Sequence, residues 1–380
     1  MHSPAPIAVV IGTRPEAIKM APVLRALEAR GRRCALVCTG QHPTLDLAAA
    51  GVDRDADSWL PLDAYALEVE AMCDAIEALA HEWLCDVRPP LVVVQGDTNS
   101  ALGAARAAYR LGLPIAHVEA GLRTFDMSDP WPEERNRIEI DAMSDLLFAP
   151  TPAACDNLRA QDVRGRVILS GNSGIDAVLA VAAGITMPAR EPMRPMILAT
   201  VHRRENRGAG IVAVGAALRT IAAADEVDIV VPLHPNAGAR AEMIAAAGGA
   251  RGISLIAPQN YAATVALMLR CDLILTDSGG LQEEAPALGR PVLILRASTE
   301  RQEAIDAGSA ILVGTDTARI VGETRRLLSD REALTRMSVP AFPFGTGNAG
   351  AIIAEFVIEY VDHAPLRRMA RTEPPALMRT

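Results

Sequence analysis

The feature that most constrains the fold of this chain is a regular alternation of short apolar runs and longer amphipathic segments. Each apolar run has the length of a strand, is rich in Val, Ile and Leu, and ends in a polar or glycine-containing cluster. The predicted strands include 7–11, 34–39, 91–94, 114–117, 167–172, 196–201, 227–233, 273–275 and 292–295. Half of the residues are apolar but only 3% are aromatic, which suits helices packed on buried parallel sheets. We therefore predict an α/β fold with parallel sheets.

The chain is longer than one hydrophobic core usually supports, and its 380 residues suggest two domains. A loop with Pro188, Pro192 and Pro195 separates two strand-helix series, and we place the boundary near Asn172. Ligands of such sheets bind outside the carboxyl ends of the strands. Two Rossmann-like domains with their polar edges facing each other would form a cleft, which is a common place for a substrate.

Composition narrows the partners and the compartment. The formal charge of −9 argues against nucleic acid as the main partner, since such proteins normally present a basic surface. Six cysteines are scattered without CxxC spacing, which indicates a reducing compartment. The N-terminus lacks a basic region, and no apolar stretch reaches membrane-spanning length. We expect a cytoplasmic protein with no membrane partner.

The stretch from His117 to Arg137 packs five acids, three arginines and a histidine between two apolar segments. Charges gathered at a strand end must be paired, solvated or used, because burying an unpaired charge costs several kcal/mol. The stretch reads as half of a catalytic site. Glu119 follows a strand, and Glu133 opens a helix where it can face a ligand. Arg137 and Asp141 share that helix face, and we expect them to form a salt-bridged exposed surface.

Two other places in the first half, the turn after the strand 91–94 and the start of the first helix, allow both a structural and a functional explanation. Asp97 follows the strand 91–94, and a helix N-cap explains it about as well as a functional role does. Thr13 and Glu16 have capping-box spacing, with a proline between them in the expected first turn. Arg14 and Lys19 are cations near the positive end of the same helix, which a docked phosphate would account for.

The second half contains a different kind of candidate phosphate-binding site. Asp277-Ser278-Gly279-Gly280 lies at a strand-to-helix turn, where small residues expose backbone N–H groups at a helix N-terminus. Glu284 and Arg301, which lie nearby in the sequence, strengthen the prediction of a phosphate-binding site at this turn. His202, at a strand end beside arginines, is predicted to bind an anion, while His234 is explained equally well as a contact or as a turn residue.

Several kinds of chemistry are not indicated. The first turn lacks GxGxxG and no P-loop occurs, so neither a nicotinamide cofactor nor a Walker-type nucleotide site is predicted. No His pair on one helix and no Cys/His set suggests a metal, and no GxSxG suggests an acyl-enzyme.

Seven ordered motifs resemble the bacterial non-hydrolysing UDP-N-acetylglucosamine 2-epimerase family, over about residues 7 to 348. They are GTRPEAIKMAPV (12–23), QGDT (95–98), HVEAGLRT (117–124), PWPEERNR (130–137), VHRREN (201–206), LTDSGGLQEEAPALGRPVLILR (275–296) and TER (299–301). The resemblance implies the two-domain GT-B-type fold of one large class of glycosyltransferases. It also implies that the C-terminal segment 357–380 returns to the domain of residues 1–172, which leaves 173–356 as the UDP-binding domain.

The resemblance further implies an enzyme that interconverts UDP-GlcNAc and UDP-ManNAc without a cofactor. UDP is eliminated to give 2-acetamidoglucal and is added back with inversion at C2, which supplies ManNAc-type sugars for cell-surface polysaccharide. The likeness assigns Asp97, Glu119 and Glu133 as catalytic acids and His202 as the residue that assists the leaving phosphate. The likeness also implies a homodimer and a set of UDP contacts, namely Arg14, Lys19, His202, Ser278, Gly279, Gly280, Glu284 and Arg301, with Glu284 on the ribose.

Three departures from the family pattern bear on regulation and binding. The family usually reads QHREM or QHRQM where this chain has Gln41-His42-Pro43-Thr44-Leu45, and often has Arg where this chain has Asp63-Ala64-Tyr65. Relatives use those positions to hold a second UDP-GlcNAc as an activator, so we expect weak or absent activation. Thr264 stands near the place where relatives put an aromatic residue against uracil.

Three other functions compete with this interpretation. A hydrolysing 2-epimerase would release ManNAc and UDP from much the same site. A UDP-sugar glycosyltransferase would use the same UDP contacts but would need an acceptor, and the acids between 119 and 134 exceed what transfer requires. A non-catalytic sensor would have no need for three such acids together.

Overall fold

The structure is a computed structural model that describes residues 5–63, 67–128, 130–186, 194–224 and 226–363. Its internal contacts divide the chain into two units. The first contains the described residues of Met1–Ala177 and Phe344–Thr380, and the second is Val178–Pro343. The sequence places these divisions at 172 and 356 instead. Part of the predicted returning segment, 364–380, lies outside the described residues.

The first unit is built on a seven-stranded sheet in which every pairing is parallel. The strand order is β3-β2-β1-β4-β5-β6-β7. The strands are β1 (Ile7–Ile11), β2 (Cys34–Cys38), β3 (Ser58–Trp59), β4 (Val92–Gln95), β5 (Ile115–Val118), β6 (Leu146–Ala149) and β7 (Arg166–Leu169). The helices are α1 (Arg14–Glu28), α2 (Val69–Val87), α3 (Asn99–Arg110), α4 (Glu133–Met143), α5 (Pro152–Ala160) and α14 (Ala349–His363), and α6 (Ser173–Ala183) begins in this unit and continues into the second.

The second unit repeats the arrangement with a six-stranded parallel sheet of order β10-β9-β8-β11-β12-β13. Its strands are β8 (Met196–Thr200), β9 (Asp228–Pro232), β10 (Ile253–Ile256), β11 (Leu273–Thr276), β12 (Val292–Ile294) and β13 (Ala310–Leu312). Its helices are α7 (Ala209–Ala224), α8 (Ala237–Ala247), α9 (Tyr261–Arg270), α10 (Gly279–Ala287), α11 (Gln302–Asp306), α12 (Thr317–Ser329) and α13 (Arg331–Met337). The predicted pair of parallel-sheet α/β domains is confirmed.

Each sheet reverses its winding direction once, and this reversal locates the ligand edge. In the first unit the reversal lies between β1 and β4, and in the second unit it lies between β8 and β11. Open α/β sheets bind ligands beyond the carboxyl ends of the strands at this switch point. The polar residues that follow β1, β4, β8 and β11 are the ones that the sequence marks as functional.

The central strands of the first sheet are largely apolar because helices cover the sheet. All residues of β1 and β2 are buried, and β4 and β5 are buried along their full lengths. One core cluster joins β1, β4 and β5 to Ala-rich α3 and to residues of α2 and α4. Ala and Gly on α3 let α2 approach closely, since a Cβ on Gly103 would lie 2.9 Å from the Cys73 carbonyl oxygen.

The first helix begins as its sequence predicts. Thr13 is the N-cap of α1, and both hydrogen bonds of the capping box with Glu16 are present. Pro15 lies in the first turn. The strands that were not predicted include β3, β10 and β13. β3 and β13 have only two and three residues, and β10 is only partly buried, so none of them gives a clear strand-length apolar run.

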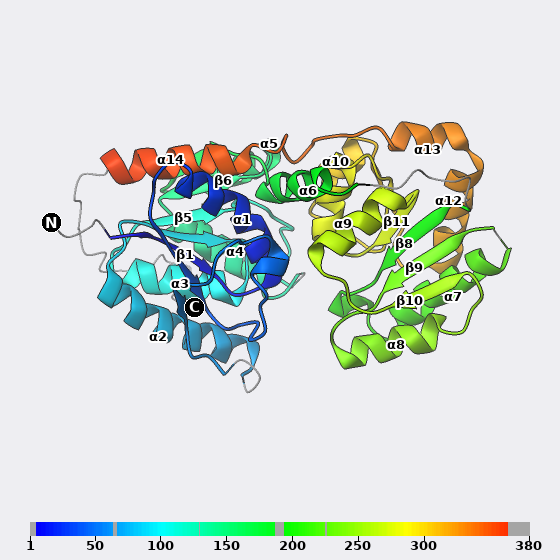
Figure 1. The fold of residues 1–380 in the computed structure, drawn as a ribbon, viewed down its shortest axis with the longest axis horizontal. Helices are drawn as coiled ribbons and strands as arrows, with labels where there is room; N and C mark the ends of the chain where they lie inside the picture. Colours follow the sequence, from blue (N-terminus) through cyan, green and yellow to red (C-terminus); the bar gives the residue numbers. More distant parts are fainter. Residues whose placement is uncertain (1–4, 64–66, 129, 187–193, 225, 364–380) are drawn as a thin grey trace. The chain divides into compact units, whose positions relative to one another are not determined.

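The C-terminal helix α14 lies along α1, its neighbour in space but far from it in sequence (Figure 1). Asp176 on α6 fixes the start of α14 by accepting hydrogen bonds from the backbone N–H groups of Ala349 and Gly350, at 3.1 and 2.9 Å. Gly350 lets the two helices approach, because a Cβ there would lie 2.9 Å from the carbonyl oxygen of Pro22.

All six cysteines are free thiols. Among the described residues, none of the helices has both the length and the hydropathy needed to cross a membrane.

We expect Gly350→Ala to lower the free energy of unfolding of the first unit by about 1–3 kcal/mol, because the new methyl group overlaps the α1 backbone. This loss exceeds the gain of up to about 1 kcal/mol that Ala brings to a helix. Trp59, Trp83 and Trp131 all lie in the first unit, so urea unfolding followed by tryptophan fluorescence reports on it. The control is Ala351→Ser on the exposed side of α14, which should change little. Unchanged stability of Gly350→Ala would show that the helix contact is not close-packed.

Candidate functional site

Glu119 lies immediately after β5 in a strained backbone conformation. Its φ is +71°, in the left-handed region that few residues other than glycine adopt. The backbone N–H groups of Glu119 and Ala120 both donate to the carbonyl oxygen of Phe148, at 3.0 Å, and hold this turn. Such strain, of order 1–3 kcal/mol, persists where the surroundings enforce it and concentrates at functional sites.

The Glu119 carboxylate is held by two donors, one on α1 and one at the end of β4. Lys19 Nζ forms an ion pair with Oε2, and Gln95 Nε2 donates to the same oxygen at 2.9 Å. Lys19 is 8% exposed. The sequence assigns Lys19 to a phosphate, and the structure places its ammonium group on a candidate catalytic acid.

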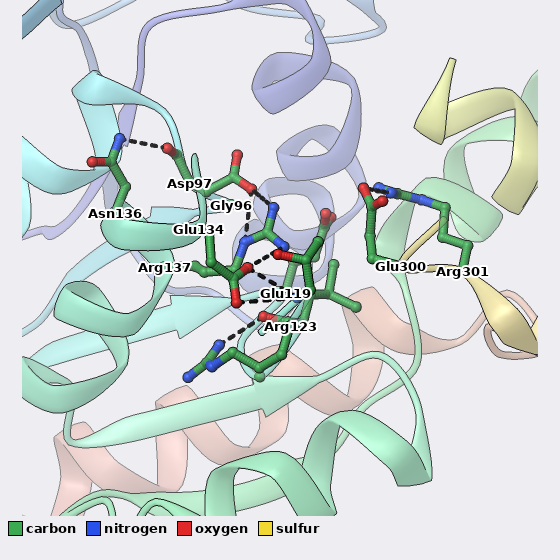
Figure 2. A network of polar contacts seen from close by, with 12 residues as sticks. Gly96, Asp97, Glu119, Arg123, Glu134, Asn136, Arg137, Glu300 and Arg301 are labelled. Carbon is green, nitrogen blue, oxygen red and sulfur yellow. Dashed lines mark hydrogen bonds and ion pairs between the residues drawn. The ribbon is translucent and has the colours of Figure 1, made fainter. Parts of the chain in front are cut away.

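Asp97 lies in the turn after β4, and its side chain does not cap α3. The N-cap is Thr98, whose hydroxyl accepts from the backbone N–H of Ala101. The Asp97 carboxylate instead binds the Arg137 guanidinium, whose Nε lies 3.1 Å from Oδ2. Asn136 donates to the Asp97 carbonyl oxygen at 2.9 Å (Figure 2). The capping explanation for Asp97 is therefore wrong.

Glu134 and Glu133 lie side by side in the chain but have different surroundings. Glu134 is fully buried and accepts hydrogen bonds from the backbone N–H groups of Thr124 and Phe125, and Arg137 also binds it. It holds the loop that leads into α4. Glu133 is the first residue of α4 and is partly exposed, although its Oε2 atom is buried.

The predicted exposed salt-bridge surface on α4 is wrong. Arg137 is 4% exposed and Asp141 is 1% exposed. Arg137 lies between Asp97 and Glu134 (Figure 2), and Asp141 lies between His117 and Arg123. The spacing correctly puts both residues on one helix face, but that face is turned inward.

The β1–α1 and β2 turns complete the first-unit edge. Arg14 is exposed at the start of α1. Burial and the nearby Arg14 lower the pKa of His42, whose backbone N–H donates to the Gly12 carbonyl oxygen at 2.9 Å. Gln41 accepts from the backbone and hydroxyl of Ser100. Pro43 and Thr44 follow this turn, and Ala64 lies outside the described residues.

In the second unit a buried carboxylate that the sequence did not single out fixes the turn after β8. Asp277 is completely buried and accepts hydrogen bonds from the backbone N–H groups of His202 and Arg203, each at 2.9 Å, and from Asn206 Nδ2 at 2.8 Å. In the sequence, Asp277 is visible only as the first residue of the DSGG motif. The His202 and His234 rings meet edge to face, with centroids 5.0 Å apart.

The start of α10 combines small residues with a guanidinium group. Ser278 is the N-cap but its side chain makes no capping hydrogen bond. A Cβ on Gly279 would lie 2.6 Å from Cζ of Arg301 and would displace that guanidinium group, while Gly280 faces open space. Exposed backbone N–H groups beside an arginine are suited to bind a phosphate.

Acidic residues hold Arg301 in this position. Its Nε donates to Glu283 at 2.7 Å, and it forms an ion pair with Glu300 (Figure 2). Burial acts to raise the pKa of Glu300, but Arg301 and Arg296 hold that pKa well below its usual range. Glu300 therefore stays ionised and keeps the guanidinium group in place.

Glu284 is 7% exposed and accepts a hydrogen bond from the Tyr261 hydroxyl at 3.1 Å. Burial and Glu284 raise the pKa of Tyr261, so the phenol remains a donor. Thr264, one turn further along α9, donates its hydroxyl to the Asn260 carbonyl oxygen. Within the described part of the chain, no group of three or more His, Cys, Asp and Glu side chains is arranged to hold a metal.

Comparisons with known proteins identify the family to which the chain is similar. The family model described as UDP-N-acetylglucosamine 2-epimerase matches residues 25–358. The UDP-N-acetylglucosamine 2-epimerase of Salmonella typhimurium is 40% identical over 374 residues, which cover 93% of this chain and 98% of that protein.

Solved structures give the same result. The UDP-GlcNAc 2-epimerase from Neisseria meningitidis bound to UDP-GlcNAc is 36% identical, covers 93% of this chain and 99% of its own, and has a TM-score of 0.88. The glycotransferase of kitacinnamycin is 14% identical, covers 94% of this chain and 99% of its own, and has a TM-score of 0.60. The second likeness concerns the fold alone.

Burial raises the pKa of Glu16 to about 7, although hydrogen bonds from Thr98, Thr13 and Gly12 oppose the rise. The unfolded chain releases this proton near pH 4.5, so the folded state is favoured in full below that pH and loses stability as the pH rises through 7. We expect the wild type to lose roughly 3 kcal/mol relative to Glu16→Gln across this window. Urea unfolding of both proteins at pH 4.5 and about pH 8 measures the difference, and a constant difference would contradict the assignment.

Proposed function

Because this chain belongs to the UDP-N-acetylglucosamine 2-epimerase family, we propose that it interconverts UDP-GlcNAc and UDP-ManNAc by elimination and re-addition of UDP. It is an isomerase acting on carbohydrates. The observation that carries the mechanism is the first-unit edge, where Asp97 and Glu119 are each held by a cation and Glu133 is partly exposed. The ManNAc-type product would serve cell-surface polysaccharide.

The reaction needs a carboxylate on the sugar. The C2 proton of UDP-GlcNAc is not activated by a neighbouring carbonyl group, so its removal must be coupled to departure of the diphosphate. A carboxylate takes the proton, the C2–H electrons form the C1–C2 double bond, and the C1–O bond breaks to release UDP. The product is 2-acetamidoglucal. UDP then adds back to C1 while a carboxylic acid protonates C2 on the opposite face.

Asp97, Glu119 and Glu133 are the candidates for these proton transfers. Lys19 and Gln95 orient the Glu119 carboxylate through an ion pair and a hydrogen bond. Arg137 binds the Asp97 carboxylate and Asn136 binds the Asp97 backbone carbonyl, and together they hold Asp97 in place. Proton transfer by a positioned side chain contributes about 10²–10⁴-fold to the rate.

The second unit supplies the contacts for UDP. Ser278, Gly279, Gly280 and Arg301 are suited to hold the negative charge that develops on the leaving diphosphate, and His202 assists that phosphate. Glu284, kept in place by Tyr261, takes the ribose. Arg14 is an exposed cation that can bind the diphosphate from the first unit.

The non-hydrolysing outcome is favoured over release of free ManNAc. The acid-bearing segment 130–137 and the α10 turn keep the full family pattern of the non-hydrolysing enzymes. A UDP-sugar glycosyltransferase is less well supported, because sugar transfer has no use for three acids at the first-unit edge.

Incubation with UDP-GlcNAc in D2O, followed by NMR of the sugar, tests the proposal. We expect UDP-ManNAc with deuterium at C2, since the proton removed is exchanged with solvent before re-addition. Free ManNAc with UDP would establish hydrolysis instead. A requirement for an acceptor would establish transfer.

Variants of the three acids serve as internal controls in the same assay. Asp97→Asn, Glu119→Gln and Glu133→Gln should each lower kcat by about 100-fold or more. Glu77→Gln is the matched control, because Glu77 is an ion-paired carboxylate on α2 that contacts Arg106 and Arg110 rather than the acids.

We also expect UDP-GlcNAc to give little or no activation of reactions started from UDP-ManNAc. Pro43 and Thr44 replace the residues with which relatives hold an activating second UDP-GlcNAc. Initial rates of the reverse reaction with and without added UDP-GlcNAc measure the effect. Clear stimulation would refute the expectation.

Two further properties belong to this proposal. A homodimer is expected from the family likeness, and sedimentation equilibrium tests it. A cytoplasmic location is supported by six free thiols, which a reducing compartment preserves, and cell fractionation tests it.

A further inference from the structure

Two buried side chains in the first unit, His117 and Asp141, form a hydrogen-bonded pair that the proposed mechanism does not use. His117 is 0% exposed and Asp141 is 1% exposed. His117 Nδ1 lies 2.6 Å from Asp141 Oδ1, and His117 Nε2 lies 2.8 Å from the carbonyl oxygen of Gly96. His117 is on β5 and Asp141 is on α4, so the pair joins the sheet to the helix that Glu133 begins.

The partners of the ring determine how many protons it carries. A backbone carbonyl oxygen can only accept, so Nε2 must carry a proton. The other ring nitrogen faces a carboxylate, which also accepts when it is ionised. Both ring nitrogens of His117 therefore face oxygen atoms that can accept a hydrogen bond.

The surroundings of Asp141 keep it ionised. Its second oxygen, Oδ2, accepts from Arg123 at 2.6 Å and from the backbone N–H of Gly121 at 3.2 Å. Burial acts to raise the pKa of Asp141, but His117 and Arg123 together lower it below its ordinary value. Arg123 itself is fixed by Gln161, which accepts from Nε at 3.1 Å.

This network touches each of the three segments that carry the candidate acids. Through His117 it holds the carbonyl group of Gly96, the residue before Asp97. Through Oδ2 it holds Gly121, two residues after Glu119, in a turn where a Cβ would lie 2.3 Å from the Ala154 carbonyl oxygen. Through its own backbone it belongs to α4, which begins at Glu133. Figure 2 shows Gly96, Asp97, Glu119 and Arg123 gathered at this edge.

We propose that Asp141 is a positioning residue: it keeps His117 as a buried imidazolium, and the pair fixes the mutual placement of the segments bearing Asp97, Glu119 and Glu133. This inference rests on the proposed function, since it assigns the network to the placing of those acids. Neither side chain has to touch the substrate, because both act through backbone groups next to the acids. A displacement of about 1 Å at a reacting group can cost about 100-fold in rate.

The variant Asp141→Asn removes the negative charge of residue 141 while keeping the size and shape of its side chain. The new amide oxygen can still accept from Arg123, while the amide NH2 group faces Nδ1 of His117. Nδ1 must then accept a hydrogen bond, so His117 becomes neutral. It keeps its Nε2–H bond to the Gly96 carbonyl oxygen but loses the charge pairing with residue 141 that holds β5 against α4. We expect kcat for epimerisation to fall about 100-fold while KM for UDP-GlcNAc stays close to the wild-type value, because the UDP contacts of the second unit are untouched.

Glu139→Gln is the matched control. Glu139 is also buried on α4 and also binds an arginine, with its Oε2 2.9 Å from Arg106, but its carboxylate binds α3 rather than the turns at Gly96 and Gly121. The same carboxylate-to-amide change there should leave kcat close to the wild-type value. Equal losses of kcat in Asp141→Asn and Glu139→Gln would reduce the role of Asp141 to general stability and overturn the proposal, as would an undiminished kcat in Asp141→Asn.

A spectroscopic measurement on the wild type tests the proposal without any activity assay. In protein labelled with 15N in the histidine rings, both nitrogens of His117 should be protonated at neutral pH, and Nδ1 should lose its proton in Asp141→Asn. The His117→Gln variant assigns the signal by its loss. An unprotonated ring nitrogen on wild-type His117 would overturn the proposal. If the wild type fails to epimerise UDP-GlcNAc, the proposed function falls, and the state of His117 is still decided by this measurement.

Discussion

Pairing of carboxylates with buried basic side chains holds together the edge of the first unit on which the proposed chemistry depends. Asp97 is paired with Arg137, Glu119 with Lys19, and Asp141 with His117 and Arg123. A buried pair is stable only while both partners remain, because the loss of one leaves an uncompensated charge that costs about 3–5 kcal/mol. Each charge therefore needs its partner close by, and these pairings fix where the carboxylates lie. Proton transfer at C2 requires carboxylates in fixed positions.

Buried acidic residues also organise the second unit, but there they position hydrogen-bond donors and an arginine. There a buried aspartate, Asp277, binds backbone N–H groups after β8, and two acids fix Arg301 against the start of α10. The acids of this unit organise donors and a cation, which suits a diphosphate. Both sheets have the same strand order, so the switch point of each is the place where these charges collect. One unit thus presents carboxylates, and the other presents hydrogen-bond donors.

Much of this could be predicted from sequence, and the limits have physical causes. Apolar runs ending in polar clusters predicted the parallel sheets. They also predicted the edge of the first sheet at which Asp97 and Glu119 lie and the edge of the second sheet at which Ser278 lies. Helical spacing put Arg137 and Asp141 on one face of α4, but periodicity cannot tell an inward face from an outward one when both carry charge. The N-cap of α3 was missed by one residue, because Asp and Thr are both good caps. The pairings of Asp277 with His202 and of Tyr261 with Glu284 join distant segments, and local sequence holds no record of them.

The central claim is that the C1–O bond of the UDP-sugar breaks and re-forms during epimerisation. UDP-GlcNAc carrying 18O at the oxygen between C1 and the β-phosphorus tests it directly. If UDP is released and added back, the label will move to the non-bridging positions of the β-phosphate as epimerisation proceeds, and 31P NMR will record the move. Epimerisation with the label retained wholly in the bridging position would contradict the account.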